Sequence, residues 1–291
     1  MRKMDPLVSI VLPTYNGSRY IRQSIESCLG QTYENLELII VDDCSTDNTM
    51  DIIKSYGDGR VRIVRHEKNM RLPESLNTGF SLSKGRYLTW TSDDNCYAKD
   101  AIKSMLGYLQ SKKADFVYCD YFILEGSSFE AAKRVSIPDT ATFRELNFVR
   151  ACFLYSRDVK EAVGKYSPEA ELSEDYDYWI RVSKKFILNH LKEPLYYYRV
   201  HPQALYTRRY WEQEAVKCLV RFRHGLFSEN EAAGFLFRLF ARKKNPALRL
   251  LFYLSAPFFF TPSLRVLLSE FQEQSISFTE CKNRIMGKAQ R

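Results

Sequence analysis

The chain has 291 residues, of which 45% are hydrophobic and 27% charged, as in a folded protein with one large domain or two small ones. This composition excludes a disordered, collagen-like or coiled-coil chain. The net charge of +8 is uneven, because residues 181–291 hold 20 Lys and Arg against 8 Asp and Glu. Such a basic segment can contact nucleic acid, phosphate groups or an anionic membrane surface, or it can be a solvated face.

The first half of the chain alternates short apolar runs with segments of helical periodicity. Strands are predicted at Val8–Pro13, Leu36–Val41, Val61–Arg65, Tyr87–Thr91 and Phe116–Leu124, and helices at Ser18–Gly30, Thr46–Tyr56, Leu72–Lys84 and Ala101–Gln110. This alternation predicts an α/β fold with a mostly parallel sheet that helices cover on both faces. In such sheets a ligand binds beyond the carboxyl ends of the strands, so we expect the chemistry in the loops that follow them.

The second half of the chain is less regular. Residues 125–147 are polar and are expected to be irregular. Strands are predicted at Phe148–Tyr155 and Leu195–Val200, with a helix at Glu174–Lys185 between them. From Arg208 onward the pattern is helical only.

The cysteines and the hydropathy pattern indicate a compartment. The seven cysteines include no CxxC pair, which favours a reducing environment over a disulfide framework or a structural zinc site. The N-terminus has no apolar stretch that resembles a signal peptide, and no uncharged run reaches the roughly 18 residues of a membrane-spanning helix. We therefore expect a cytoplasmic protein.

Two acidic clusters close predicted strands, at residues 41–47 and 91–95. A carboxylate at the end of a strand can accept a hydrogen bond from a base or a ribose hydroxyl, or it can bind a hard cation. Adjacent carboxylates repel each other, so they are usually found with a metal or with hydrogen-bond donors. Oxygen ligands favour Mg²⁺ or Mn²⁺ over zinc. The alternative is that Ser45, Thr46 and Asp47 only form a turn and cap the next helix.

Several motifs occur in a recognisable order. They are residues 8–17 (VSIVLPTYNG), 31–33 (QTY), 41–47 (VDDCSTD), 77–79 (NTG), 85–88 (GRYL), 92–94 (SDD) and 174–179 (EDYDYW). Together they resemble the family 2 glycosyltransferases with the GT-A fold, over roughly residues 7–202. The QxxRW-type motif of the processive members is absent, so the resemblance implies an enzyme that adds one sugar at a time.

The resemblance implies a division of the chain. Residues 1–205 would form the GT-A catalytic domain, with a nucleotide-sugar part at about 1–95 and an acceptor part at about 96–205. Residues 206–291 would form a basic, aromatic-rich helical region.

The resemblance also implies roles in donor binding. Pro13 and Tyr15 would line the pocket for the nucleotide base, and Asp43 would accept the imide N–H of that base, which favours uracil. Asp93 would lie by the ribose, and Asp94 would hold the Mn²⁺ or Mg²⁺ ion that bridges the diphosphate. The sequence equally allows Asp93 to be the metal ligand.

Three basic residues are candidates for the same site. Arg199 and His201 match an Arg-x-His segment that lies close to the diphosphate in similar family members. His201 could be a second metal ligand or a phosphate donor, and Arg71 lies in a loop that approaches the base. The alternatives are a loop histidine with protein partners and a solvated arginine.

The remaining acidic cluster matches the place of the general base in the family. The resemblance implies that Asp175 takes the proton from the acceptor hydroxyl and that Glu174 orients the acceptor. The alternative is that these residues only begin a helix, with Ser173 as its cap.

Residues 235–268 combine aromatic and basic side chains, and prolines interrupt them. This segment is too short and broken to cross a bilayer, but it suits basic amphipathic helices at an anionic membrane surface. The alternative is a helical pair that packs on the catalytic domain or on a second subunit. A lipid-linked acceptor would explain a location at the inner face of the cell membrane.

The sequence thus predicts an inverting, metal-dependent glycosyltransferase. It would move a sugar from a nucleotide diphosphate, preferably UDP, to a glycan or lipid-linked acceptor in bacterial surface polysaccharide synthesis. The alternative is a non-catalytic nucleotide-sugar-binding or membrane-scaffold protein of the same fold. Nucleic acid is not expected as a partner, because the aromatic residues of the basic part lie in apolar runs.

Overall fold

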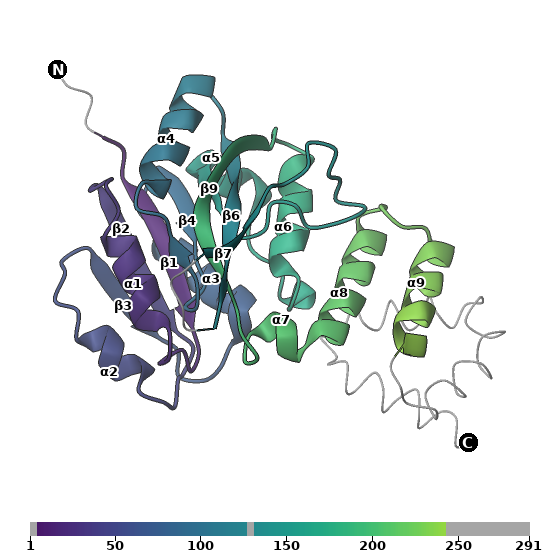
Figure 1. Cartoon of the computed structure of the whole chain (residues 1–291), viewed down its shortest axis with the longest axis horizontal. Helices are drawn as coiled ribbons and strands as arrows, with labels where there is room; N and C mark the ends of the chain where they lie inside the picture. The colour runs from purple at the N-terminus through teal and green to yellow at the C-terminus, as the bar shows by residue number, and fades with distance from the viewer. Residues whose placement is uncertain (1–4, 127–130, 243–291) are drawn as a thin grey trace.

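The computed structural model describes residues 5–126 and 131–242. In this part of the chain a nine-stranded sheet forms the body of the molecule (Figure 1). The strands are β1 (Val8–Thr14), β2 (Leu36–Asp42), β3 (Val61–Arg65), β4 (Tyr87–Trp90), β5 (Cys96–Tyr97), β6 (Phe116–Glu125), β7 (Ala131–Val135), β8 (Phe153–Ser156) and β9 (Asn189–Val200). The helices are α1 (Ile21–Leu29), α2 (Thr49–Lys54), α3 (Arg71–Leu82), α4 (Ala101–Lys112), α5 (Arg157–Val163), the 3₁₀ turn η1 (Pro168–Ala170), α6 (Glu174–Ser183), α7 (Leu205–Arg208), α8 (Tyr210–Arg223) and α9 (Glu229–Arg242).

The strand order in the sheet is β3-β2-β1-β4-β8-β6-β9-β5, with β7 beside β6. β1 runs parallel to β2 and β4, and β2 runs parallel to β3, which confirms the helix-flanked α/β sheet. Beyond β4 the sheet is mixed, because β8 is antiparallel to β4 and β6 while β9 is parallel to β6. Strand direction therefore changes next to the loop that carries the second acidic cluster.

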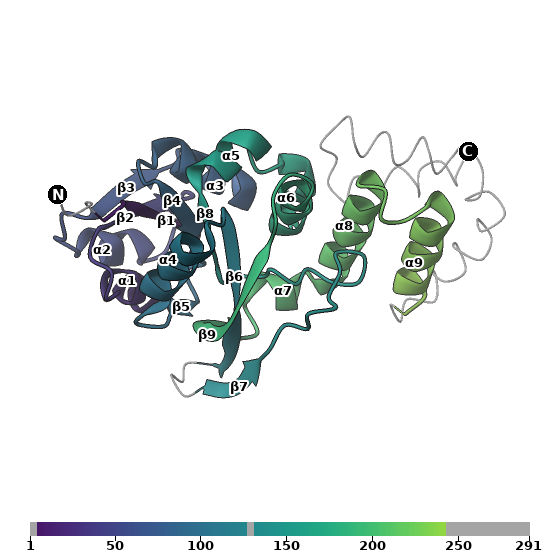
Figure 2. The ribbon, with the colours of Figure 1, turned by 90° about the horizontal axis from the view of Figure 1, so that it is seen from above.

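Strand β1 shows why helices flank both faces. Side chains alternate between the faces of a strand, and in β1 all of them are buried. Val8, Ile10 and Leu12 pack in one apolar cluster with α1 and α4, whereas Val11 packs in the other cluster with α3. Figure 2 shows α1 and α4 on one side of the sheet and α3 and α5 on the other. Burial on both faces is typical of the parallel part of an α/β sheet.

Two sequence predictions about the second half are wrong. Residues 131–135, expected to be irregular, form β7 along the edge of β6. Lys133 and Arg134 of β7 are exposed, so this strand lacks the apolar alternation that would reveal it. The strand predicted from Phe148 begins only at Phe153, because Arg150 has a φ of 50°, which interrupts extended backbone.

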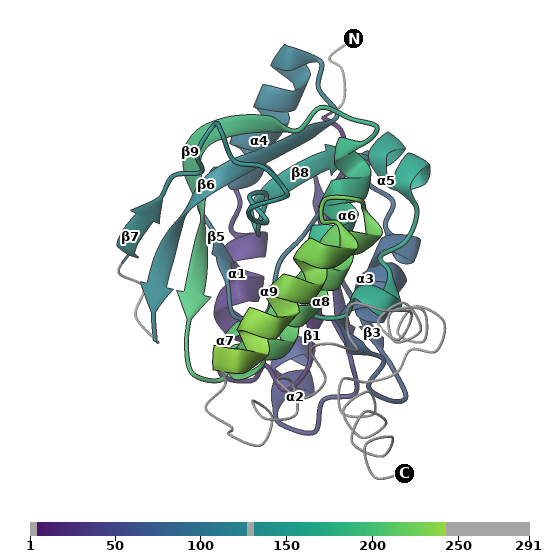
Figure 3. The same ribbon diagram turned by 90° about the vertical axis from the view of Figure 1, so that its right-hand side faces the viewer.

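Between Arg208 and Arg242, where the described residues end, the chain forms helices, as predicted for this part. α8 and α9 lie side by side (Figure 3). Arg221 of α8 donates from Nε to Tyr176 Oη of α6 at 2.9 Å, and His224 Nε2 lies 2.8 Å from Asp177 Oδ1. The first C-terminal helices therefore pack on the catalytic part of the chain.

Most of the predicted membrane-binding segment, residues 243–268, lies outside the described residues, and the division at residue 205 stays a prediction. Among the helices that are described, none is both long enough and apolar enough to cross a membrane.

Helix α3 packs closely on β1 at Gly79. A Cβ at this position would lie 2.3 Å from a γ-methyl of Val11, so Gly79→Ala should lower the free energy of unfolding by about 1–3 kcal/mol. Gly107 in α4 is the matched control, because a Cβ there meets nothing within 4 Å. Gly107→Ala should raise the free energy of unfolding by about 0.5–1 kcal/mol. Urea unfolding measures both changes, and shifts of the same sign would contradict the close contact.

Candidate active site

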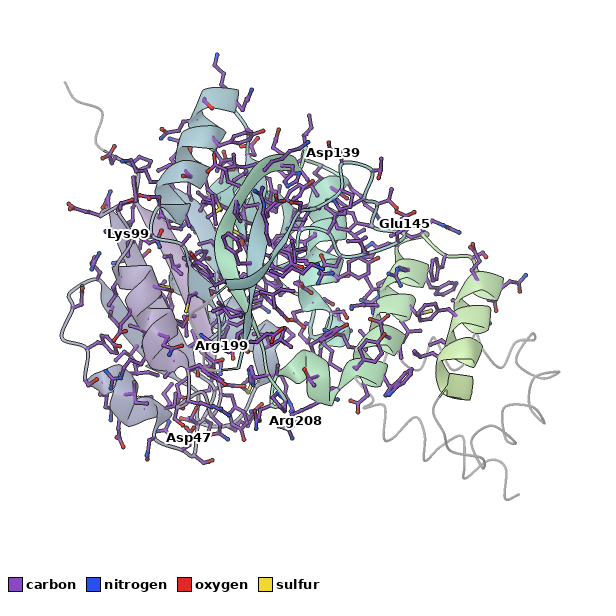
Figure 4. The ribbon with its side chains drawn as sticks, in the orientation of Figure 1. Asp47, Lys99, Asp139, Glu145, Arg199 and Arg208 are labelled. Atoms are coloured by element: carbon purple, nitrogen blue, oxygen red, sulfur yellow. The ribbon has the colours of Figure 1, made fainter. Side chains whose placement is uncertain are left out.

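The loops after β1, β2 and β4 meet at one end of the sheet. Thr14 at the end of β1 joins both acidic clusters, because its carbonyl accepts from the Asp43 N–H at 2.9 Å and its Oγ1 donates to Asp93 Oδ2 at 2.5 Å. In the view of Figure 4 this end of the sheet points down: Asp47, in the loop after β2, and Arg199 lie toward the lower end of the molecule, whereas Asp139 lies near its top. The parallel strands thus bring Thr14, Asp43 and Asp93, which are distant in sequence, to one edge of the sheet.

Asp43 is buried, and its carboxylate holds the loop that leads into α3. Its Oδ1 accepts from the Met70 N–H at 2.7 Å and lies 2.7 Å from His66 Nδ1, while its Oδ2 accepts from the Arg71 N–H at 2.8 Å. His66 Nε2 in turn lies 3.0 Å from Thr78 Oγ1. A carboxylate can accept about four hydrogen bonds, so the carboxylate of Asp43 can accept one more from a bound group.

The other predicted base-pocket residues surround this loop. Pro13 is buried within β1, whereas Tyr15 is 50% exposed. Arg71 begins α3 with a φ of 73°, a conformation that costs a non-glycine residue roughly 1 kcal/mol or more. Its exposed side chain places Nε 4.0 Å from Glu171 Oε1.

Asp93 is held tightly against the loop after β1. A Cβ at Gly17 would lie 2.2 Å from Asp93 Oδ2, so only glycine allows the carboxyl group to come this close. Burial, and then the charge of neighbouring Asp94, raise the pKa of Asp93 to about 7. A cation or a hydrogen-bond donor that arrived here would favour the ionised form.

Asp94 faces His201. Asp94 Oδ2 lies 3.1 Å from His201 Nε2, and this hydrogen bond raises the pKa of His201. The other oxygen, Oδ1, is buried and has no hydrogen-bond partner within the described residues. In the same part of the chain, no group of three or more His, Cys, Asp or Glu side chains could hold a metal ion. The roles of Asp94 and His201 as metal ligands stay predictions.

Arg199 is buried next to Asp94 and holds the backbone of that residue. Its side chain is 1% exposed, and it donates to the Asp94 carbonyl at 2.9 Å, the Gly126 carbonyl at 2.7 Å and Gln23 Oε1 at 2.7 Å. The guanidinium also lies 4.7 Å from the centre of the Tyr20 ring. These contacts position the backbone of Asp94. A contact between Arg199 and a phosphate stays a prediction.

The third acidic cluster opens α6. Asn147 Nδ2 donates to Asp175 Oδ2 at 2.7 Å, and burial raises the pKa of Asp175 against this hydrogen bond. Glu174 is 5% exposed, and its Oε2 has no partner among the described residues. Burial, and then the Asp175 charge, raise the pKa of Glu174 to about 8. Ser173 makes no side-chain cap, so the alternative of a merely capped helix start lacks its defining bond.

The phenol of Tyr198 is affected by the charges of both Asp94 and Asp175. Burial raises the pKa of its phenol, and the charges of Asp94 and Asp175 raise it further, so both carboxylates lie within electrostatic reach. Residues 147, 198 and 66 were not predicted as site residues. Because residues two apart in a strand share a face, the sequence could have predicted that Tyr198 lies on the same face as Tyr196. Asn147 lies in a segment without periodicity, so no pattern predicts its position. No sequence pattern marks His66 as the partner of Asp43.

A profile of glycosyl transferase family 2 matches residues 9–213. TuaG of Bacillus subtilis (strain 168), a glycosyltransferase provisionally named for teichuronic acid biosynthesis, is 27% identical over 215 residues, which cover 72% of this chain and 85% of TuaG. WfaP of Escherichia coli is 29% identical over 214 residues, covering 71% of this chain and 82% of WfaP. Its name is UDP-Glc:alpha-D-GlcNAc-diphosphoundecaprenol beta-1,3-glucosyltransferase. Other relatives are longer, and the match spans 65% of one glycosyltransferase from Rickettsia prowazekii (strain Madrid E).

Two solved structures share the architecture. TarS 1-349 of S. aureus has a TM-score of 0.62 at 17% identity, covering 91% of this chain and 86% of that chain. TarS has also been solved with UDP and with UDP-GlcNAc. The mannosyltransferase PcManGT from Pyrobaculum calidifontis, in complex with GDP-Man and Mn²⁺, has a TM-score of 0.61 at 14% identity, covering 93% and 85%.

At these identities the structural likeness shows the GT-A fold alone. The family profile, in contrast, covers more than half of the chain, and the curated relatives are named glycosyltransferases. The chain therefore belongs to glycosyl transferase family 2 and is a glycosyltransferase.

Proposed function

We propose that this glycosyltransferase is inverting and metal-dependent, and that it transfers a sugar from a nucleotide diphosphate, preferably UDP, to a hydroxyl of a glycan or lipid-linked acceptor. The observation that carries this proposal is the presence of two acidic groups with polar partners: Asp94 faces His201, and Asp175 accepts a hydrogen bond from Asn147. The first suits a diphosphate with its cation, and the second suits a base. The name of WfaP, which includes UDP-Glc, and the complex of TarS with UDP support a uridine donor.

The residues beside Asp94 fit a Mn²⁺ or Mg²⁺ ion. The buried Oδ1 of Asp94 has no partner in the described part of the chain, and the ring of His201 could supply a second ligand when it gives up its proton. Such cations are commonly held by one or two protein side chains, with phosphate oxygens and water in the other positions. When bound, the cation would neutralise the charge that develops on the leaving diphosphate. The Mn²⁺ in the PcManGT complex supports this assignment. Asp93, occupied by Thr14, is left to the ribose.

The donor base would lie between Tyr15 and Asp43. The exposed ring of Tyr15 would stack on the base, and the remaining acceptor capacity of Asp43 would take the imide N–H of uracil. Arg71 would reach the base or the ribose from the loop that Asp43 orders. Since Asp43 also holds that loop, base recognition and loop order depend on the same carboxylate.

Asp175 would act as the general base. It would remove the proton from the acceptor hydroxyl while that oxygen bonds to the anomeric carbon and the bond from that carbon to the diphosphate breaks. The acceptor oxygen attacks the face opposite the leaving group, so a single displacement inverts the anomeric configuration. Asn147 orients the carboxylate, and the raised pKa of Glu174 keeps that neighbour protonated at neutral pH. The negative charge of the two groups is thus concentrated on Asp175.

The alternative of a non-catalytic binding or scaffold protein explains less. Burying Glu174 and Asp175 together costs stability, because carboxyl groups lose hydration and repel each other. Binding of a nucleotide sugar does not require either group. The names of TuaG and WfaP support an acceptor in surface polysaccharide synthesis, and a lipid-linked acceptor would place the enzyme at the inner face of the membrane.

Asp175→Asn tests the proposed base. The amide keeps the shape of the carboxylate but cannot accept the proton, so transfer should fall by about 10²–10⁴-fold. Binding of UDP with Mn²⁺, measured by calorimetry, should not change. Retained transfer would assign the base elsewhere, with Glu174 as the next candidate, and loss of UDP binding would point to misfolding.

Glu174→Gln tests the raised pKa of Glu174. The folded-state pKa of about 8 exceeds the ordinary value of 4.5, so the folded protein holds more protons than the unfolded chain between these pH values. The wild type should therefore lose stability relative to Glu174→Gln as the pH rises through this window. Thermal unfolding of both proteins at about pH 5 and about pH 8 measures the difference in Tm. A difference in Tm that stays constant with pH would contradict the raised pKa.

A further inference from the structure

We propose that Gln213 of α8 is a positioning residue for the general base, because its side-chain amide holds the loop that leads into Glu174 and Asp175. The inference rests on the proposed function, since it takes Asp175 as the base. It adds a residue that no sequence motif marks, on a helix outside the acidic clusters. The match to the family profile ends at residue 213, so most of α8 lies beyond it.

Three successive residues of this loop contact the start of α8. Arg209 Nη1, at the N-cap of the helix, lies 3.4 Å from Glu171 Oε1. Gln213 Nε2 donates to the Leu172 carbonyl at 2.9 Å, and the Gln213 carbonyl accepts from Ser173 Oγ at 3.5 Å. Arg209 and Gln213 are four residues apart, so they lie on the same side of the helix. This side of α8 is therefore turned to the loop before the proposed base.

Leu172 has a backbone conformation that needs support. Its φ of 79° lies in the left-handed region, which costs a residue with a side chain roughly 1–2 kcal/mol. Such a conformation persists only where the surrounding contacts determine it. The Leu172 carbonyl accepts from Ser173 Oγ at 2.8 Å, but that bond is local to the loop. The ion pair of Arg209 with Glu171 is more than a third exposed on both sides and contributes little. The bond from Gln213 is therefore the main polar contact that ties the loop to α8.

The orientation of the Gln213 amide follows from its partner. A backbone carbonyl only accepts hydrogen bonds, so the NH₂ group must face Leu172. The other end of the amide, Oε1, is buried and has no partner among the described residues. A buried acceptor without a partner costs roughly 1–3 kcal/mol, and an apolar side chain of the same length would avoid that cost. The bond to the loop, rather than packing, therefore explains a glutamine at this position.

The conformation at Leu172 determines where the acidic side chains lie. Helix α6 begins directly after Ser173, with Glu174 and Asp175 in its first turn. Glu174 is 5% exposed, and Asp175 accepts from Asn147 Nδ2 at 2.7 Å. A different φ at Leu172 would turn the start of α6 and move both carboxyl groups away from these positions. A displacement of about 1 Å at a reacting group can lower a rate by about 10²-fold.

The first test measures the placement of Glu174 in the full-length protein without a ligand. In Gln213→Met the side chain keeps its length and its helix propensity but cannot donate. Water should then reach Glu174 and lower its pKa toward the ordinary value. The free energy of unfolding of the wild type, relative to Glu174→Gln, should fall between about pH 5 and about pH 8. In the Gln213→Met background this fall should shrink to about half or less, as measured by urea unfolding.

His224→Asn is the matched control. It removes a different contact between α8 and α6, in which His224 Nε2 lies 2.8 Å from Asp177 Oδ1, and leaves the loop before Glu174 intact. Each comparison with Glu174→Gln cancels the titration of His224, so the fall with pH should equal that of the wild type. Gln213→Ala, which also removes the buried amide oxygen, is a second variant with the same expectation as Gln213→Met.

The second test measures turnover of a UDP-sugar with Mn²⁺. UDP release at saturating donor should fall by about 10–10²-fold in Gln213→Met, because the base is displaced. The affinity for UDP should not change, and His224→Asn should release UDP at the wild-type rate. An unchanged fall of stability with pH, an unchanged rate or weaker UDP binding in Gln213→Met would overturn the proposal. Absence of UDP release by the wild type would instead contradict the proposed function, and the unfolding measurements would still decide whether Gln213 holds the loop.

Discussion

Carboxyl groups that lose their water on folding and lie next to one another repel, and both acidic groups of this site are under that constraint. Asp93 beside Asp94, and Glu174 beside Asp175, have raised pKa values in at least one partner because of burial and of the neighbouring charge. The fold tolerates this arrangement by supplying donors: Thr14 for Asp93, His201 for Asp94 and Asn147 for Asp175. One buried oxygen of Asp94 and one of Glu174 still lack a hydrogen-bond partner among the described residues.

The sheet topology explains how these groups come together. Parallel β1, β2 and β4 end at the same edge, which places Asp43 and Asp93 on either side of Thr14. After the change of direction at β4, β9 returns alongside β5 and brings Tyr198, Arg199 and His201 to the second acidic cluster. Helix α8 then packs on α6 and supports the loop before Asp175. The part of the site around Asp43 and Asp93 thus follows from local βαβ order, whereas the part around His201 and Asp175 depends on contacts between distant segments.

The same difference decides what the sequence could predict. The alternating apolar runs predict β1 to β4 and their helices, because burial on both faces leaves a strong periodic signal. The acidic residues at the strand ends were also visible, since they follow those runs directly. In contrast, β7 is an exposed edge strand, and the positive φ of Arg150 breaks a run that reads as a strand. Asn147 and His66 gain their importance only from tertiary contacts, and no local pattern carries that information.

The central claim is that the Asp43 and Asp94 end of the sheet binds a nucleotide-sugar donor together with a divalent cation. The most direct test incubates the full-length protein with a panel of nucleotide sugars and Mn²⁺, without acceptor, and measures the nucleoside diphosphate that slow hydrolysis releases. We expect release of UDP from a UDP-sugar, loss of this activity with excess chelator, and its return when Mn²⁺ is restored. Release of no nucleoside diphosphate from any donor, or release that continues unchanged in excess chelator, would contradict the account.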